Sequence, residues 1–155
     1  MLAQIVLISE TASLKINFEN VLHVKNHQIA LLSIQYPKLR DIDQDHGRRS
    51  KRLAKDSLMN AHSITVFVHC DKVKENVYVN DKFPFITSSS VRCLDVMQLK
   101  FEQDFNVTEI QNPTYHDLDV DNLFNLNIEM RDLNGDLVQL PTDGYIVMKV
   151  AIKPH

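Results

Sequence analysis

"NLNIEMRDLNGDLVQLPTDGYIVMKVAIK", from Asn125 to Lys153, contains two runs in which apolar and polar side chains alternate. The apolar positions are Leu126, Ile128 and Met130 in the first run, and Ile146, Met148, Val150 and Ile152 in the second. Successive side chains of a β-strand point to opposite faces of the sheet, so a period of two predicts a strand with one buried face. This stretch therefore predicts an all-β protein.

The segment Asp132–Asp136, between the two runs, has two interpretations. A helix-loop-helix calcium site has oxygen ligands at alternate positions and a glycine at the sixth position. Counted from Asp132, Gly135 is at the fourth position, and the flanking runs predict strands rather than helices. Asn-Gly between alternating runs is typical of a tight hairpin, in which both central residues adopt positive φ. We therefore predict a turn at Asn134-Gly135.

Other segments extend the β prediction. "SITVFVHC" (63–70) alternates, with Cys70 on the apolar face. "AQIVLIS" (3–9), "LKINF" (14–18) and "IALLSIQY" (29–36) are more continuously apolar, which predicts strands buried on both faces. "VRCLDVMQLKFEQ" (91–103) fits one bent strand or two short ones.

Helical signals are few. The best candidate for a short helical turn is "RSKRLAKDSLMNA" (49–61), and "HDLDVDNLF" could begin another helix with Asp117 or Asp119 as its N-cap. The predicted fold is an antiparallel β-sandwich or jelly-roll-like barrel of about eight strands with little helix. We expect a single domain over residues 1–155, with a polar, basic insertion at about residues 38–61.

Length and composition narrow the class of protein. A chain of 155 residues with 44% hydrophobic and 24% charged residues can bury a core without disulfides. A net charge of −3 argues against a dedicated nucleic-acid binder, whose domain is usually strongly basic.

Cys70 and Cys93, the only cysteines, could form one disulfide, but we favour two buried thiols in a reducing compartment. The start lacks a basic leader, and no segment reaches the about 20 apolar residues of a membrane span, so we expect a soluble protein with no membrane partner.

The strongest local charge lies in "HGRRSKRLAK", from His46 to Lys55. Its candidate contacts for nucleic acid or another polyanion are Arg48, Arg49, Lys51 and Arg52. Neutralising phosphates releases counterions and so favours binding. The alternatives are a nuclear-import signal, a basic cleavage site, and a solvated loop balanced by the acidic residues before it.

The possible catalytic residues and metal ligands of this sequence do not form a recognisable motif. His69, Cys70 and Asp71 with Cys93 offer at most three zinc ligands, without the paired short spacing of structural zinc sites. We expect Cys70 in the core and His69 facing outward. The sequence lacks a nucleophile elbow, a phosphate loop and a dinucleotide glycine motif. We therefore expect no enzyme activity, no cofactor and no metal.

Two blocks of the sequence carry a resemblance to a known family, in the order in which they occur there. The first, Ile5–Lys38, has a strand with Phe18 and Asn20 and then "ALLSIQYP" (30–37); the second comprises 63–73, 112–118 and 126–140 with the closing strand. These blocks resemble small capsid proteins, of penton or minor capsid type, from Polinton/Maverick elements, adintoviruses and related insect viruses. The chain departs from that pattern at His27-Gln28, where the family usually has tryptophan before "AL".

The resemblance implies a viral structural protein that resides in the virion and is assembled in the cytoplasm or nucleus of the host cell. Its implied partners are copies of itself, other capsid subunits and, through the basic cluster, packaged nucleic acid. The candidate subunit-interface residues are Phe67, Tyr78, Phe83, Phe85 and Tyr145, and the alternative for each is ordinary core packing. The alternative functions are a virion surface spike that binds a host receptor or glycan, and a cellular, non-catalytic β-sandwich binding module.

Overall fold

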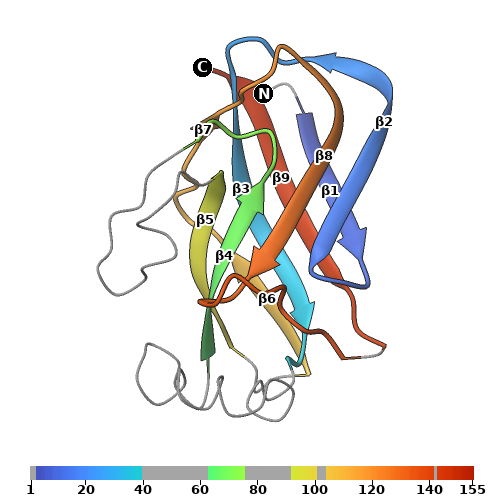
Figure 1. Cartoon of the computed structure of the whole chain (residues 1–155), viewed down its shortest axis with the longest axis vertical. Coiled ribbons are helices and arrows are strands. Elements are labelled where there is room, and N and C mark those ends of the chain that lie inside the picture. Colours follow the sequence, from blue (N-terminus) through green and yellow to red (C-terminus); the bar gives the residue numbers. More distant parts are fainter. Residues whose placement is uncertain (1–2, 40–62, 76–91, 101–103, 142) are drawn as a thin grey trace.

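The computed structural model describes residues 3–39, 63–75, 92–100, 104–141 and 143–155. Within these ranges the chain forms nine strands in two antiparallel sheets packed face to face, and no helix (Figure 1). Sheet A has the order β1-β9-β3-β6, with strands Ala3–Ser9, Ile146–Pro154, His27–Pro37 and Phe105–Glu109, and the short β7 (His116–Asp117) also pairs with β3. Sheet B has the order β2-β8-β4-β5, with strands Ser13–His23, Asn122–Arg131, Ser63–Cys70 and Cys93–Lys100. The predicted all-β sandwich is confirmed.

The core lies between the two sheets and is built from the predicted alternating positions. The inward side chains of β4 and β9 are fully buried: Ile64, Val66, Val68, Cys70, Ile146, Met148, Val150 and Ile152. Leu126, Ile128 and Met130 of β8 join the same cluster. The period of two thus located the strands, since each sheet of a sandwich turns its inner face to the other sheet. In β4 the outer face is buried as well, with Ser63, Thr65 and Phe67 at 7%, 5% and 4% exposed, so one buried face is a wrong prediction for this strand.

The prediction that the first strands are buried on both faces is correct for part of β3 and wrong for β1 and β2. In β2, Lys15 and Asn17 are exposed. Ile29, Ala30 and Leu31 of β3 are all buried. In β1, by contrast, Val6 is 50% and Ile8 is 65% exposed. β1 is an edge strand of sheet A, and the sandwich covers only its inner side. An apolar run therefore does not reveal by itself whether both of its faces are covered.

A helix at "HDLDVDNLF" is a wrong prediction, and the candidate helical turn at 49–61 lies outside the described ranges. Asp117 belongs to β7, which pairs with β3, and Asn122 begins β8. The Asp119 N–H donates to the Lys72 carbonyl at 2.8 Å, and the Asp117 carbonyl accepts the Lys74 N–H at 2.9 Å. These bonds to a distant segment of the same chain use the backbone groups that a helix would bond internally.

The predicted turn at Asn134-Gly135 forms, but with other dihedrals. Gly135 has a φ of +83°, whereas Asn134 does not have positive φ, so the expectation of two positive values is wrong. The Asp132 carbonyl accepts the Gly135 N–H at 3.1 Å, and the Asp132 N–H donates to the Asp136 carbonyl at 2.9 Å. This is the pattern of a turn followed by one left-handed residue, a common alternative in hairpins.

The turn reverses the chain only briefly. Leu137 forms an isolated bridge with Arg131, and the Val138 N–H donates to the Met130 carbonyl at 3.0 Å. The chain then crosses to sheet A, where β9 pairs with β1 and β3 rather than with β8. Among the described residues, none forms a helix long and apolar enough to cross a membrane.

Candidate functional site

Most of the predicted contact residues lie outside the described ranges. These are the basic residues Arg48, Arg49, Lys51 and Arg52, and the aromatic residues Tyr78, Phe83 and Phe85. Of the other two candidates, Phe67 is 4% exposed and so presents little surface to a partner, whereas Tyr145 is 53% exposed. An interface role for these five aromatic residues stays a prediction, and Tyr145 directs attention to its surroundings.

Tyr145 adjoins the outer face of sheet A, where the register of β9, β3 and β6 aligns their side chains in rows. Gln35 of β3 pairs with Val147 of β9 on one side and with Val107 of β6 on the other. Side chains of directly paired residues lie on the same face of a sheet, so these three form one row across it. Gln35 and Val147 are half-buried, and Val107 is 52% exposed.

A parallel row begins beside Tyr145. Pro37 pairs with Phe105 of β6, which is 54% exposed. A Cβ atom on Gly144 would lie 2.6 Å from Pro37 Cγ, so the segment before β9 packs against Pro37. Tyr145 lies two residues before Val147, just outside β9, and the alternation of β9 continued to it gives it the third place in this row. We call the outward residues Gln35, Pro37, Phe105, Val107, Tyr145 and Val147 the outer patch.

Strand β6 is inverted relative to an ordinary sandwich strand. Its polar residue Asn106 is 5% exposed, whereas the apolar residues on either side, Phe105 and Val107, are more than half exposed. Sequence reasoning missed these two residues. The alternation in "FNVTE" could have indicated a strand here, but alternation does not show which of the two faces points into the core.

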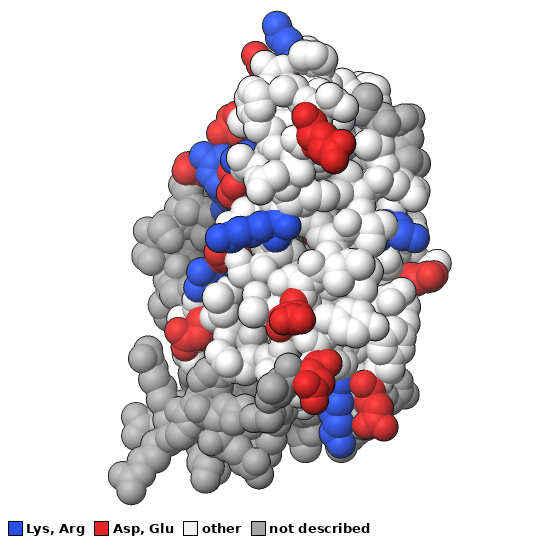
Figure 2. Space-filling model, turned by 90° about the vertical axis from the view of Figure 1, so that its right-hand side faces the viewer, with Lys and Arg blue, Asp and Glu red and all other residues white. Residues whose placement is uncertain are grey.

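Strand β1 extends the outer patch towards the edge of sheet A. Ile8 pairs with Val147 and is 65% exposed. Figure 2 shows the side of the molecule on which β1 and β2 lie, and there the charged side chains are few and separated by wide neutral areas. Exposed apolar residues on one sheet face, such as Ile8, Phe105 and Val107, are typical of a protein–protein contact.

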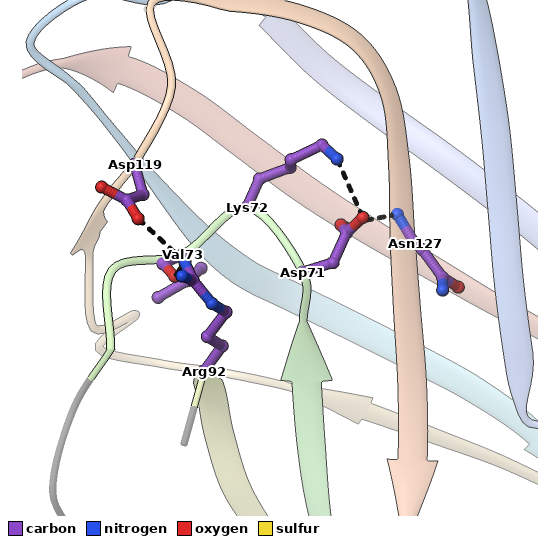
Figure 3. Close-up of polar contacts among 6 residues, drawn as sticks. All are labelled: Asp71, Lys72, Val73, Arg92, Asp119 and Asn127. Carbon is purple, nitrogen blue, oxygen red and sulfur yellow. Dashed lines mark hydrogen bonds and ion pairs between the residues drawn. The ribbon is translucent and has the colours of Figure 1, made fainter. Parts of the chain in front are cut away.

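The opposite end of the sandwich is polar and internally bonded (Figure 3). Arg92 Nη1 donates to the Val73 carbonyl at 2.8 Å and to Asp119 Oδ2 at 3.0 Å. Asp71 Oδ1 accepts the backbone N–H of Asn127 at 3.1 Å. These bonds fasten the segment after β4 to β8 and to the segment after β7.

An open cleft of about 450 Å³ lies at this polar end, lined by Asn26, His27, Lys74, Asp117, Leu118, Asp119, Val120, Asp121 and His155. Asp117 already accepts a hydrogen bond from Gln28 Nε2 at 3.0 Å and lies 3.8 Å from His155 Nδ1. Asp119 is bonded to Arg92. The described residues contain no group of three or more His, Cys, Asp and Glu side chains placed to hold a metal ion.

Of the residues weighed as zinc ligands, no three come together among the described residues. Adjacent strand residues point to opposite faces, and Cys70 is fully buried in the core while His69 is paired with Cys93 on β5. Burial raises the pKa of the Cys70 thiol to about 12, so this thiol stays protonated at neutral pH. Burial and the nearby Arg131 lower the pKa of His69. Cys70 and Cys93 are free and buried, as predicted.

Comparison with known proteins shows the fold. No known family model and no curated protein sequence matches this chain. The crystal structure of the mavirus penton protein is similar over almost the full length, with a TM-score of 0.61, 7% identity, and coverage of 97% of this chain and 98% of that one. The chain therefore has the fold of a viral penton protein.

Proposed function

We propose that this chain is a structural subunit of a virus or virus-like particle, of penton or minor capsid type. The observation that carries the proposal is the full-length likeness to the mavirus penton protein, which leaves no large part of either chain unmatched. The outer patch adds support, since a subunit that assembles must expose apolar surface to its neighbours. We propose no catalytic role and no cofactor.

Within this class, we propose a relation to the capsid proteins of Polinton/Maverick elements, adintoviruses and related insect viruses. The support is the order of the two blocks that resemble those proteins, with Phe18 and Asn20 in the first. The proposed location is the virion, after assembly in the cytoplasm or nucleus of the host cell. We further propose that residues 1–155 form one domain with an insertion at about 38–61.

The decisive experiment is co-expression of the chain with the other capsid genes of its genome, followed by electron microscopy of purified particles. The proposal expects the chain at the vertices or as a minor component, in fixed ratio to the main subunit. Particles that form complete shells while the chain stays in the soluble fraction would contradict it. A spike would instead sit outside a complete shell and bind host cells or a glycan array.

The basic cluster, Arg48, Arg49, Lys51 and Arg52, is proposed to contact packaged nucleic acid. Each lost phosphate contact should reduce the slope of log affinity against log salt by about 0.9. Replacing all four residues by alanine should therefore remove most salt-sensitive retention on a DNA column. The matched control replaces four exposed lysines outside the insertion, Lys15, Lys25, Lys74 and Lys100. Equal retention of the two variants would contradict this contact.

A further inference from the structure

We propose that two copies of this chain pair through the outer faces of their A sheets, about a two-fold axis that runs parallel to β3. This inference names the partner of the outer patch, and it rests on the proposed role of the chain in self-assembly. It commits to a second copy because the chemistry of the face is complementary to itself.

The complementarity lies in the two strands that flank β3. Ser33 of β3 pairs with Lys149 on β9 and with Glu109 on β6, in the row next to Gln35. Reading along each flanking strand, β9 presents an aromatic residue, a valine and a cation, whereas β6 presents an aromatic residue, a valine and an anion. The two series are Tyr145, Val147 and Lys149, and Phe105, Val107 and Glu109.

A two-fold axis parallel to β3 superimposes β9 of one copy on β6 of the other. Tyr145 then meets the partner's Phe105, and Val147 meets the partner's Val107. Lys149 meets the partner's Glu109, and the same contacts repeat on the other side of the axis, as in any isologous interface. An axis perpendicular to the strands would instead place Lys149 against the partner's Tyr145 and leave both charges without an opposite one.

The two charged residues are available for such a contact. Lys149 and Glu109 are both exposed, and neither forms an ion pair or a side-chain hydrogen bond with the described part of the chain. At the border of an apolar contact, opposite charges fix the register and suppress wrong pairings. Gln35, on the axis, faces the partner's Gln35, and two amide groups can donate to and accept from each other.

The size of the contact sets its strength. The paired core spans roughly 10 Å across the strands and roughly 13 Å along them, from the usual strand spacing and rise. This is smaller than the about 800 Å² per partner of a standard stable interface, even with Ile8 at its border. We therefore expect a weak, transient contact, with a dissociation constant well above the micromolar range.

Charge reversal in the full chain tests the axis itself. Lys149→Glu alone, or Glu109→Lys alone, creates two like-charge contacts per dimer and should weaken association about tenfold or more by analytical ultracentrifugation. The double variant K149E/E109K should associate like the native chain. Mixing the two single variants should give a heterodimer, because each supplies the charge that the other requires. The matched controls, Lys15→Glu and Glu19→Lys, reverse exposed charges on β2 of the other sheet and should change nothing.

The outcomes separate this pairing from the proposed function. Single variants that associate like the native chain, or a double variant that fails to recover, would overturn the pairing even if the chain still enters particles. A chain that pairs as described but never enters particles would overturn the capsid role and leave the pairing intact. Equal thermal melting of all variants checks that they are folded, since the substituted residues lie outside the core.

Discussion

The hydroxyl of Tyr36 on β3 accepts the backbone N–H of Lys100 on β5 at 2.8 Å, and so joins sheet A to sheet B through the interior. Tyr36 is 1% exposed, and its burial raises the pKa of its phenol. The bond satisfies a polar group at each end of an otherwise apolar contact, which is the usual reason for a buried tyrosine in place of phenylalanine.

Tyr36→Phe should destabilise the fold. The substitution keeps the ring in the core but leaves the Lys100 N–H without its acceptor, at a cost of about 1–3 kcal/mol in the free energy of unfolding. Urea denaturation followed by circular dichroism measures the change. Tyr145→Phe is the matched control, because Tyr145 is 53% exposed and the change there should stay within about 0.5 kcal/mol. Equal stability of the two variants would show that the bond between the sheets contributes nothing.

Asp132 organises the turn after β8, and its loss should also be measurable. Asp132 Oδ1 accepts the backbone N–H of Asn134 at 2.8 Å and that of Asp136 at 3.1 Å. Asp132→Ala removes both acceptors and should cost about 1–3 kcal/mol, since Asp132 is 5% exposed. Asp132→Asn keeps an oxygen at the same place and should recover most of the loss in a thermal melt. A loss for asparagine as large as that for alanine would mean that the carboxylate charge, and not the acceptor, matters.

The sequence was sufficient where a strand buries one face. Alternation located β4, β8 and β9 through the apolar side chains that enter the core, although the outer residues Thr65 and Phe67 of β4 are buried as well. It failed at β6, which is only five residues long and inverted, with Asn106 inward and Phe105 outward. The turn showed a similar limit: Asn134-Gly135 predicted a reversal, but the dihedrals depend on the bonds of Asp132.

The candidate site was predictable only in part for the same reason. Tyr145 was selected from the sequence as an outward aromatic residue, and it is exposed. Phe105 and Val107 were not, because an apolar side chain on the outer face of a sheet has the same letters as one in the core. Only the cross-strand register, with Gln35 between Val107 and Val147, reveals that they form a patch.

Two glycines should respond to substitution in opposite ways. Gly135 has a φ of +83° and open space around its Cα, whereas a Cβ on Gly144 would meet Pro37 Cγ at 2.6 Å and Pro141 Cγ at 2.9 Å. At Gly135, asparagine tolerates the left-handed conformation better than alanine, so Gly135→Asn should be the milder change. At Gly144 the larger side chain should be worse, with Gly144→Ala costing about 1–3 kcal/mol and Gly144→Asn more.

Chemical denaturation of these four variants gives the comparison. The crossed order, asparagine better at Gly135 and alanine better at Gly144, is the expected result. The same order at both positions would mean that one mechanism acts at both sites. Because Gly144 packs against Pro37, its substitution should also displace Tyr145 and weaken association through the outer patch.

Cys70 should make the protein less stable in alkaline solution. Burial raises the pKa of its thiol from 9.0 to about 12, so between these values the unfolded chain loses a proton that the folded chain keeps. Stability is therefore constant below about pH 9 as far as this group is concerned, and it falls as the pH rises towards 12. At about 1.4 kcal/mol per pKa unit, the full loss is about 4 kcal/mol.

Urea midpoints from pH 7.5 to pH 11 should show the decline in stability. Cys70→Ala should flatten this decline while lowering stability at every pH, because packing around the side chain is lost. Tyr36→Phe, measured in parallel, isolates the decline that the raised pKa of Tyr36 adds above pH 10. If the alanine variant keeps the native slope between pH 9 and pH 10, the thiol is not the group responsible.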